Sequence, residues 1–199
     1  DDGQEAADGT VFLDGAYELI YTNRQVGYIF RNIDIPAGAT ITAAYINVVT
    51  FSFDDPNLTI RGEYAPADFT TASHDLSSRT KTTAGVAWIA ANIGVNAYRA
   101  SPDISAVLNE IVGAGGWASG DDLALCLIDN GAGGAFYPVS YENATYGPPQ
   151  LVVEWTLPAT GNELDDATGS GAGTLGTHAA ADVTLGAVTS TAAGGVVSG

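Results

Sequence analysis

Residues 26–46 read VGYIFRNIDIPAGATITAAYI, and this stretch decides the fold class. Over residues 25–35 the side chains alternate between the two faces of an expected strand, one of which carries Val26, Tyr28 and Phe30. Pro36 and Gly38 are typical turn residues. The β-branched and aromatic run of residues 40–53 then predicts a second, longer strand. Two long strands joined by a short turn favour an antiparallel sheet.

Shorter strand patterns continue on both sides of this pair, each bounded by turn residues. They cover residues 10–13, 17–21, 58–64, 85–89, 123–128, 135–141 and 151–155. The turn pair Asp14-Gly15 predicts a hairpin between the first two. Many short strands at this spacing predict an all-β chain that folds as an antiparallel jelly-roll β-sandwich.

One helical pattern interrupts the strands, over residues 101–113. Ser101 and Pro102 suit the N-terminal cap and the first turn, and Gly113 suits the C-terminal end. The apolar stripe consists of Ile104, Val107, Leu108, Ile111 and Val112. We expect a single short amphipathic helix that closes one end of the sandwich.

Composition divides the 199-residue chain into two regions. Residues 1–157 hold every aromatic residue and form the expected sandwich domain. Residues 158–199 form a β-prone, low-complexity tail rich in Gly, Ala and Thr, which buries too little apolar area to offset its own ordering entropy. We therefore expect neighbouring subunits to order the tail, as strands added to an exposed sheet edge. Folding back over an edge strand of its own domain is the alternative.

The charge balance excludes several classes of partner. The chain has 23 acidic and 6 basic residues, a net charge of −17. Nucleic acids and anionic membrane surfaces are bound through clustered Lys and Arg, so we expect neither as a partner. No stretch is long and apolar enough to span a bilayer, so membrane insertion is not expected. The single cysteine, Cys126, alternates with leucines, which predicts an inert buried thiol.

The strand-turn-strand segment at residues 26–46 resembles the jelly-roll modules called DNRLRE domains and their relatives, which include carbohydrate-binding modules and large bacterial surface proteins. The later segments follow the same order: the helix at residues 104–112, GWASG at residues 116–120 and PPQLVVEW at residues 148–155. The similarity covers residues 8–156. Near Asn23-Arg24 the chain lacks the alternating basic and acidic run of the family, so no binding residue carries over. The resemblance implies the fold and, by analogy, contact with a glycan.

Pairs of adjacent acids in expected loops are candidate metal ligands. Calcium prefers carboxylate and carbonyl oxygens. The candidates for a Ca²⁺ site assembled from separate loops are Asp54 and Asp55, Asp121 and Asp122, and the pair Asp1-Asp2. Solvated loop carboxylates are the alternative interpretation.

Glycan binding needs exposed aromatic rings that stack on sugar rings beside polar groups. The candidate residues are Trp117, Tyr137, Tyr141 and Tyr146. Trp117 lies in a Gly-rich turn, so of the four it is the least expected to be buried in the core of the sandwich. Packing in the sandwich core is the alternative use of all four side chains.

The sequence contains no recognisable catalytic motif, and we expect no enzymatic activity. His74 and His178 stand outside any nucleophile-elbow or metal-binding helix pattern. Asp75 follows His74 directly, but a catalytic base and the group that orients it meet through space rather than as chain neighbours.

The expected function is that of a non-enzymatic structural protein in an extracellular assembly. A bacteriophage virion component (a decoration, tail or fibre protein) is the first hypothesis, with other copies or other subunits of the assembly as partners and a cell-surface glycan as a further one. The alternative is a secreted carbohydrate-binding or adhesion module from a larger bacterial surface protein.

Overall fold

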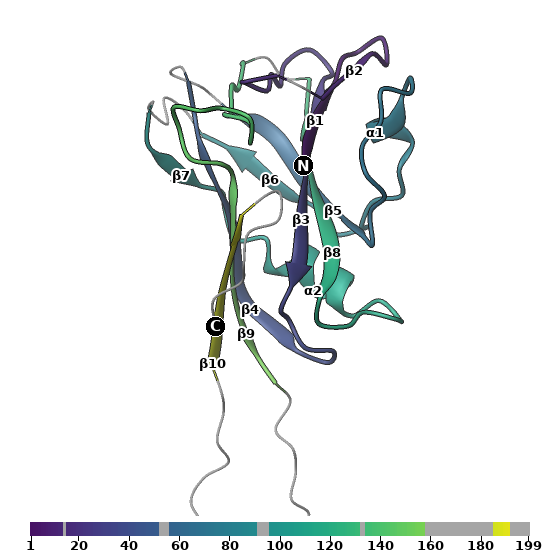
Figure 1. Ribbon diagram of the computed structural model, residues 1–199, viewed down its shortest axis with the longest axis vertical. Helices are drawn as coiled ribbons and strands as arrows, with labels where there is room; N and C mark the ends of the chain where they lie inside the picture. Colours follow the sequence, from purple (N-terminus) through teal and green to yellow (C-terminus); the bar gives the residue numbers. More distant parts are fainter. Residues whose placement is uncertain (14, 52–55, 91–95, 132–133, 158–184, 192–199) are drawn as a thin grey trace, which may run out of the picture.

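Ten strands form two antiparallel sheets in the described part of a computed structural model, which covers residues 1–13, 15–51, 56–90, 96–131 and 134–157 and the backbone of residues 185–191. The first sheet contains, in spatial order, β2 (Val11–Phe12), β1 (Asp2–Glu5), β3 (Gln25–Ile33), β8 (Asp121–Asp129), β5 (Asn57–Tyr64) and β6 (Val86–Ile89). The second contains β10 (Leu185–Thr191), β9 (Gln150–Thr156), β4 (Thr40–Val49) and β7 (Tyr98–Ala100). The two sheets form separate layers in Figure 1. The predicted all-β antiparallel sandwich is confirmed.

Strand β3 lies inside the first sheet, between β1 and β8, and both of its faces are buried. The face predicted from the alternation (Val26, Tyr28 and Phe30) points into the main core. Ile29 points the other way, into a second cluster with Phe69 and Leu76. Leu76 belongs to α1 (Asp75–Ser78), a one-turn helix that lies outside the sheet in Figure 1. This helix is an addition to the single helix that the sequence predicts.

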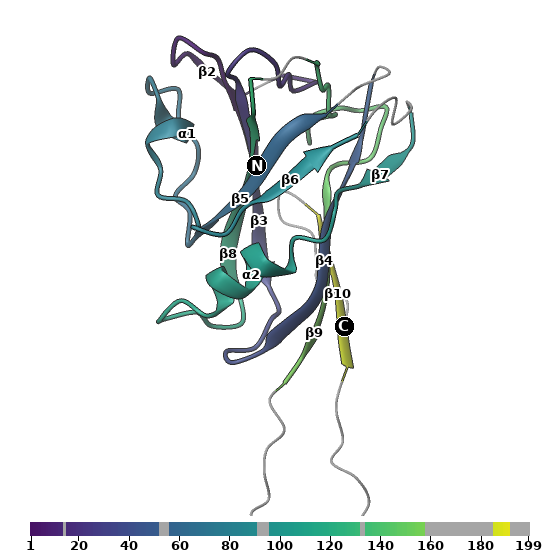
Figure 2. The same ribbon diagram turned by 180° about the vertical axis from the view of Figure 1, so that it is seen from behind.

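Helix α2 (Ser105–Val112) lies at the lower end of the sandwich in Figures 1 and 2 and packs against β4 and β5. Its buried residues are Val107, Leu108, Ile111 and Val112, so the predicted apolar stripe is confirmed. Gly62 of β5 permits this close packing, because a Cβ there would lie 2.5 Å from Ile111 Cδ1. Neither helix in the described ranges is long and apolar enough to cross a membrane.

The start of α2 differs from the prediction: the helix begins at Ser105, not at residue 101. Ser101 Oγ instead accepts a hydrogen bond from Ile46 N–H at 3.1 Å. Asp103 Oδ1 accepts from Ala44 N–H and from Ser105 N–H, both at 2.9 Å. The expected capping residues therefore tie the segment to strand β4, and they cannot also continue the helix.

The predicted hairpin across residues 14 and 15 is absent from the pairing. Val11 pairs with Glu5 of β1, while Tyr17 bridges to Val139 and Ile20 bridges to Phe136. Residues 17–20 thus form a short antiparallel ladder with residues 136–139. Because residues 17–20 pair with this distant segment, they do not pair back onto β2 as the turn residues predicted.

Residues 185–191 form β10 on the edge of the second sheet. The ladder with β9 runs from Leu185 opposite Thr156 to Thr191 opposite Gln150. This pairing corresponds to the fold-back alternative for the tail, whereas ordering by neighbouring subunits stays a prediction. Residues 158–184 and 192–199 lie outside the described residues. In the first sheet, Cys126 is fully buried as predicted, and burial raises the pKa of its thiol to about 11.

Leu108→Asp is expected to destabilise the domain by several kcal/mol, comparable with the whole stability of an ordinary domain, because Leu108 has no exposed surface and a lone carboxylate would be buried there. Urea unfolding followed by circular dichroism measures this loss. Ala106→Asp places the same group on the exposed side of α2 and should cost about 1 kcal/mol or less. Equal unfolding midpoints for the two variants would contradict the packing of α2.

Candidate functional site

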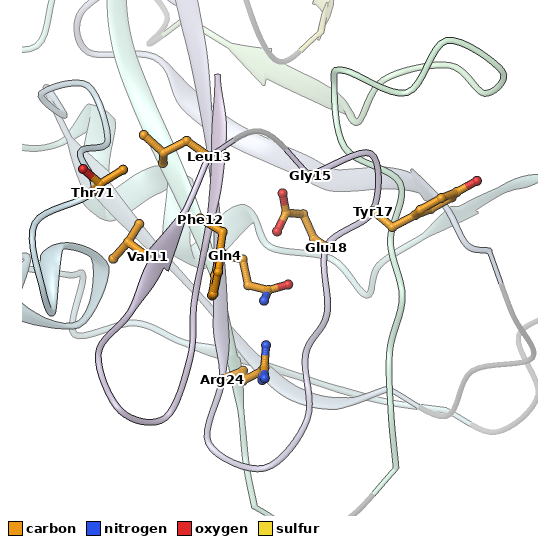
Figure 3. Close-up of a pocket in the computed structure, with 9 residues that line it drawn as sticks. All are labelled: Gln4, Val11, Phe12, Leu13, Gly15, Tyr17, Glu18, Arg24 and Thr71. Atoms are coloured by element: carbon orange, nitrogen blue, oxygen red, sulfur yellow. The ribbon is translucent and has the colours of Figure 1, made fainter.

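A pocket of about 520 Å³ opens beside β1 and β2, at the upper end of the sandwich in Figure 1. Its apolar lining comes from Val11, Phe12 and Leu13. Polar residues also line it, among them Thr71, and Figure 3 shows the side chains of Gln4, Glu18 and Arg24 directed toward its middle. The pocket therefore combines an apolar wall with an amide, a carboxyl and a guanidinium group.

Gln4 is held by the strand on which it lies. In β1 it stands opposite Phe12 of β2 and opposite Val26 of β3. Its Oε1 accepts a hydrogen bond from Leu19 N–H at 2.6 Å. This bond fixes the amide group and also fastens the segment that carries Glu18 to β1.

Arg24 is presented by a tight turn over residues 21–24. Its N–H donates to the Tyr21 carbonyl at 3.2 Å, and Thr22 and Asn23 both adopt positive φ angles. Asn23 N–H donates to Asp129 Oδ2 at the end of β8, at 2.7 Å. The guanidinium carbon of Arg24 lies 4.9 Å from the centroid of the Tyr21 ring, a cation–π contact that holds the side chain across the turn.

Two pocket residues present aromatic rings to solvent. Phe12 is 50% exposed and Tyr17 is 38% exposed. The Tyr17 ring packs against the ring of Phe51, with 4.4 Å between the two centroids, and this contact fixes the orientation of the Tyr17 ring. Exposed aromatic faces beside polar groups are the chemistry that stacks on a sugar ring and bonds its hydroxyls.

Glu18 forms the floor of the pocket and is only 2% exposed. Burial, followed by the negative charges of Asp2 and Glu142, raises the pKa of Glu18 to about 9. Without a bound cation, this carboxyl is therefore protonated at neutral pH and can donate a hydrogen bond.

The four aromatic residues singled out in the sequence do not form one site. Tyr141 is exposed and lies at the pocket end, where its N–H donates to Asp2 Oδ2 at 2.8 Å. Tyr137 and Tyr146 are half-buried in the connection between β8 and β9.

Trp117 lies at the opposite end of β8. It is 4% exposed, and its Nε1–H donates to the Ile35 carbonyl at 2.8 Å. It lies in the turn before β8 (Asp121–Asp129), whereas the turn of Arg24 bonds to the last residue of that strand, so the whole strand lies between them. In this conformation Trp117 offers a sugar no exposed ring face.

The acidic pairs singled out as calcium ligands have local partners where they are described. Asp121 Oδ2 accepts from Ala118 N–H at 2.9 Å and from the Tyr64 hydroxyl at 3.3 Å. Asp122 pairs with Arg31 at 3.0 Å. Asp54 and Asp55 lie outside the described residues. Within the described ranges, no three His, Cys, Asp or Glu side chains are arranged to hold a metal ion, and calcium binding by these pairs stays a prediction.

The sequence pattern gives no signal for the polar pocket residues. In the run of residues 17–21, the apolar side chains at 17, 19 and 21 share the face opposite Glu18, so the alternation by itself points Glu18 toward solvent. Its burial follows from the pairing of residues 17–20 with residues 136–139. Gln4 and Arg24 carry no signal either, because their pocket positions depend on pairings distant in the sequence.

Comparison with known proteins adds no identification. No protein-family model matches the chain, and no curated protein is significantly similar to it.

The raised pKa of Glu18 predicts a specific pH dependence of stability in metal-free buffer. Because the folded-state pKa of about 9 exceeds the ordinary value of 4.5, this group stabilises the fold most below pH 4.5, and that contribution disappears as the pH rises through 9. Between pH 5 and 9, thermal unfolding should show wild type losing stability relative to Glu18→Gln. Glu154→Gln, an exposed change on β9, should follow wild type. Parallel curves for wild type and Glu18→Gln would contradict the burial of an acid here.

Proposed function

We propose that this chain is a non-catalytic saccharide-binding module of the adhesion type, acting outside the cell, with the pocket between β1, β2 and residues 15–24 as its binding site. One observation carries the proposal: the half-exposed ring of Phe12 lies beside the polar side chains of Gln4 and Arg24 in one open pocket. The pocket lies at an end of the sandwich, where loops are supported by a rigid scaffold.

The size and chemistry of the pocket fit a short saccharide. A volume of about 520 Å³ lies in the range of ordinary small-molecule sites, enough for about one or two sugar rings. The apolar face of a sugar would stack on the Phe12 ring, and its hydroxyls would bond to Gln4 and Arg24. The amide of Gln4 offers donors and an acceptor and the guanidinium of Arg24 offers donors, so the two groups supply both kinds of partner that hydroxyl groups require.

A neutral sugar fits better than an acidic one. The net charge of −17 repels anionic polysaccharides over the whole surface. Arg24 is the cationic side chain in the pocket lining, and its guanidinium already contacts the Tyr21 ring. The resemblance of residues 26–46 to modules that include carbohydrate-binding domains supports the same ligand class.

Phe12→Ala should weaken saccharide binding roughly tenfold, about 1.4 kcal/mol, because it removes the most exposed ring of the pocket. A glycan array with the full chain would identify the ligand, and calorimetry would measure its affinity for both forms. Ile89→Ala removes an exposed apolar side chain on β6, outside the pocket, and should leave the affinity unchanged. Failure of every neutral glycan to bind, or equal affinity for Phe12→Ala, would reject the proposal.

A second candidate, a structural subunit of an extracellular assembly such as a virion, is favoured by a different observation. Strand β10 lies at the edge of its sheet, and no described strand pairs with its outer side. An open edge strand can accept a strand from another chain through main-chain hydrogen bonds. On this candidate, other copies or other subunits are the partners.

Amide hydrogen exchange distinguishes an assembling β10 from a closed one. In the monomer, only alternate residues of 185–191 should be protected, because successive N–H groups of an edge strand point toward β9 and toward solvent. At concentrations where the protein assembles, the remaining alternate amides should become protected as well. An exchange pattern that is the same in monomer and assembly would exclude β10 as the contact.

A further inference from the structure

Four buried oxygen atoms below the pocket lack partners. Asp2 Oδ1, Glu18 Oε1, Tyr28 Oη and Ser140 Oγ have no hydrogen-bond partner among the described residues. None of these residues is more than 2% exposed. Each such orphan atom destabilises a fold by about 1–3 kcal/mol, and charged groups cost more. Four in one place require an explanation.

The strand registers place the side chains that carry these atoms on shared faces, in two pairs. Asp2 stands directly opposite Tyr28 in the ladder of β1 and β3, so their side chains share one face. Tyr17 stands opposite Val139, which puts the side chains of Glu18 and Ser140 on a common face of the second ladder. Tyr141 N–H donates to Asp2 Oδ2 at 2.8 Å and joins the two ladders.

The ionisable side chains of this cluster (Asp2, Glu18 and Tyr28) are all acids. Burial raises the pKa of Asp2, against the hydrogen bond from Tyr141, and the nearby Glu142 carboxyl adds to the rise. Burial also raises the pKa of Tyr28, as do the charges of Asp2 and Glu18. No described Arg, Lys or His side chain forms an ion pair with Asp2 or Glu18; Arg31, for example, pairs with Asp1, Asp68 and Asp122.

We propose that Asp2, Glu18, Ser140 and Tyr28 form an internal binding site for one divalent cation of the calcium type. All four offer oxygen atoms, which Ca²⁺ prefers, and two of them are carboxylates that balance its charge. The described acids are not placed as a three-carboxylate metal centre, so the remaining ligands would be the two hydroxyls, main-chain carbonyls and water. Glu142 is exposed to solvent near Asp2, and its negative charge would add to the attraction for the cation.

A cation here would join three segments of the first 33 residues (β1, residues 17–20 and β3) to residues 138–142, which lie more than a hundred positions later. Glu18 also forms the floor of the pocket, so the ion would hold the frame on which that pocket is built. The inference does not depend on a saccharide ligand, because it rests on the buried oxygens alone. Of the acidic pairs expected from the sequence, the site includes Asp2 of the pair Asp1-Asp2, and it includes neither Asp54-Asp55 nor Asp121-Asp122.

The test is calcium titration of the full chain after treatment with a chelator. Calorimetry should detect one Ca²⁺ per chain, and Ca²⁺ should raise the melting temperature at pH 8 more than at pH 5. Glu18→Gln and Asp2→Asn should each weaken binding by about tenfold or more. Glu154→Gln should bind as wild type does. Glu18→Gln is expected to remain folded, because glutamine resembles a protonated glutamic acid, and circular dichroism checks this.

Terbium luminescence locates the ion. Tb³⁺ excited through tyrosine should emit in wild type because Tyr28 adjoins the site, and Ca²⁺ should quench the emission by displacement.

Absence of Ca²⁺ binding in wild type, or equal binding by folded Glu18→Gln and Asp2→Asn variants, would overturn the proposal. One combined outcome would also overturn it. If Glu18→Gln stabilises the chelator-treated protein at pH 8 and wild type does not respond to Ca²⁺, the buried acid is satisfied by protonation and not by a cation. If wild type binds Ca²⁺ but binds no neutral glycan, only the saccharide proposal is rejected.

Discussion

The register between β1 and β3 is the constraint on which the upper half of the molecule depends. In this register Asp2 stands opposite Tyr28 and Gln4 opposite Val26, while Gly3 turns to the outer face. A Cβ on Gly3 would lie 2.9 Å from Leu13 Cδ2, so a larger residue at this position would require the Leu13 side chain to move. A slip of one residue would move every β1 side chain to the opposite face, and the pocket would lose its amide. The register also fixes the position of Glu18, because Gln4 Oε1 accepts a hydrogen bond from the N–H of Leu19, the residue after Glu18.

Aromatic residues of this chain lie both in the core and at the surface, and the tertiary structure determines which of them are exposed. Trp88 packs against Phe136 at a centroid distance of 5.2 Å, and both are buried. Trp117 packs near Tyr64 at 5.9 Å. Phe12, in contrast, lies on a two-residue strand at the sheet edge, where nothing covers half of its ring. Its exposure results from the position of β2, and residue type alone would have favoured the tryptophans as ligand contacts.

Local periodicity accounts for what the sequence predicted, and long-range pairing accounts for what it did not. The stripe around Leu108 and the alternation through Tyr28 depend only on neighbours a few residues away, and both are confirmed. The helix start was wrong because Asp103 bonds to a strand far away in the sequence. The hairpin after Leu13 was wrong because residues 17–20 pair with a segment more than a hundred residues later. The pocket depends on that same pairing, which explains why its polar residues were missed.

The bond between Tyr141 N–H and Asp2 Oδ2 joins residues 139 positions apart, and this separation has a consequence for biosynthesis. Translation proceeds at about 5–20 residues per second, so Asp2 waits on the order of ten seconds for its partner. Such non-local contacts are the slow ones to form. Until residue 141 has been synthesised, the Asp2 carboxylate lacks this main-chain donor, so its burial in the native arrangement is a late event in folding.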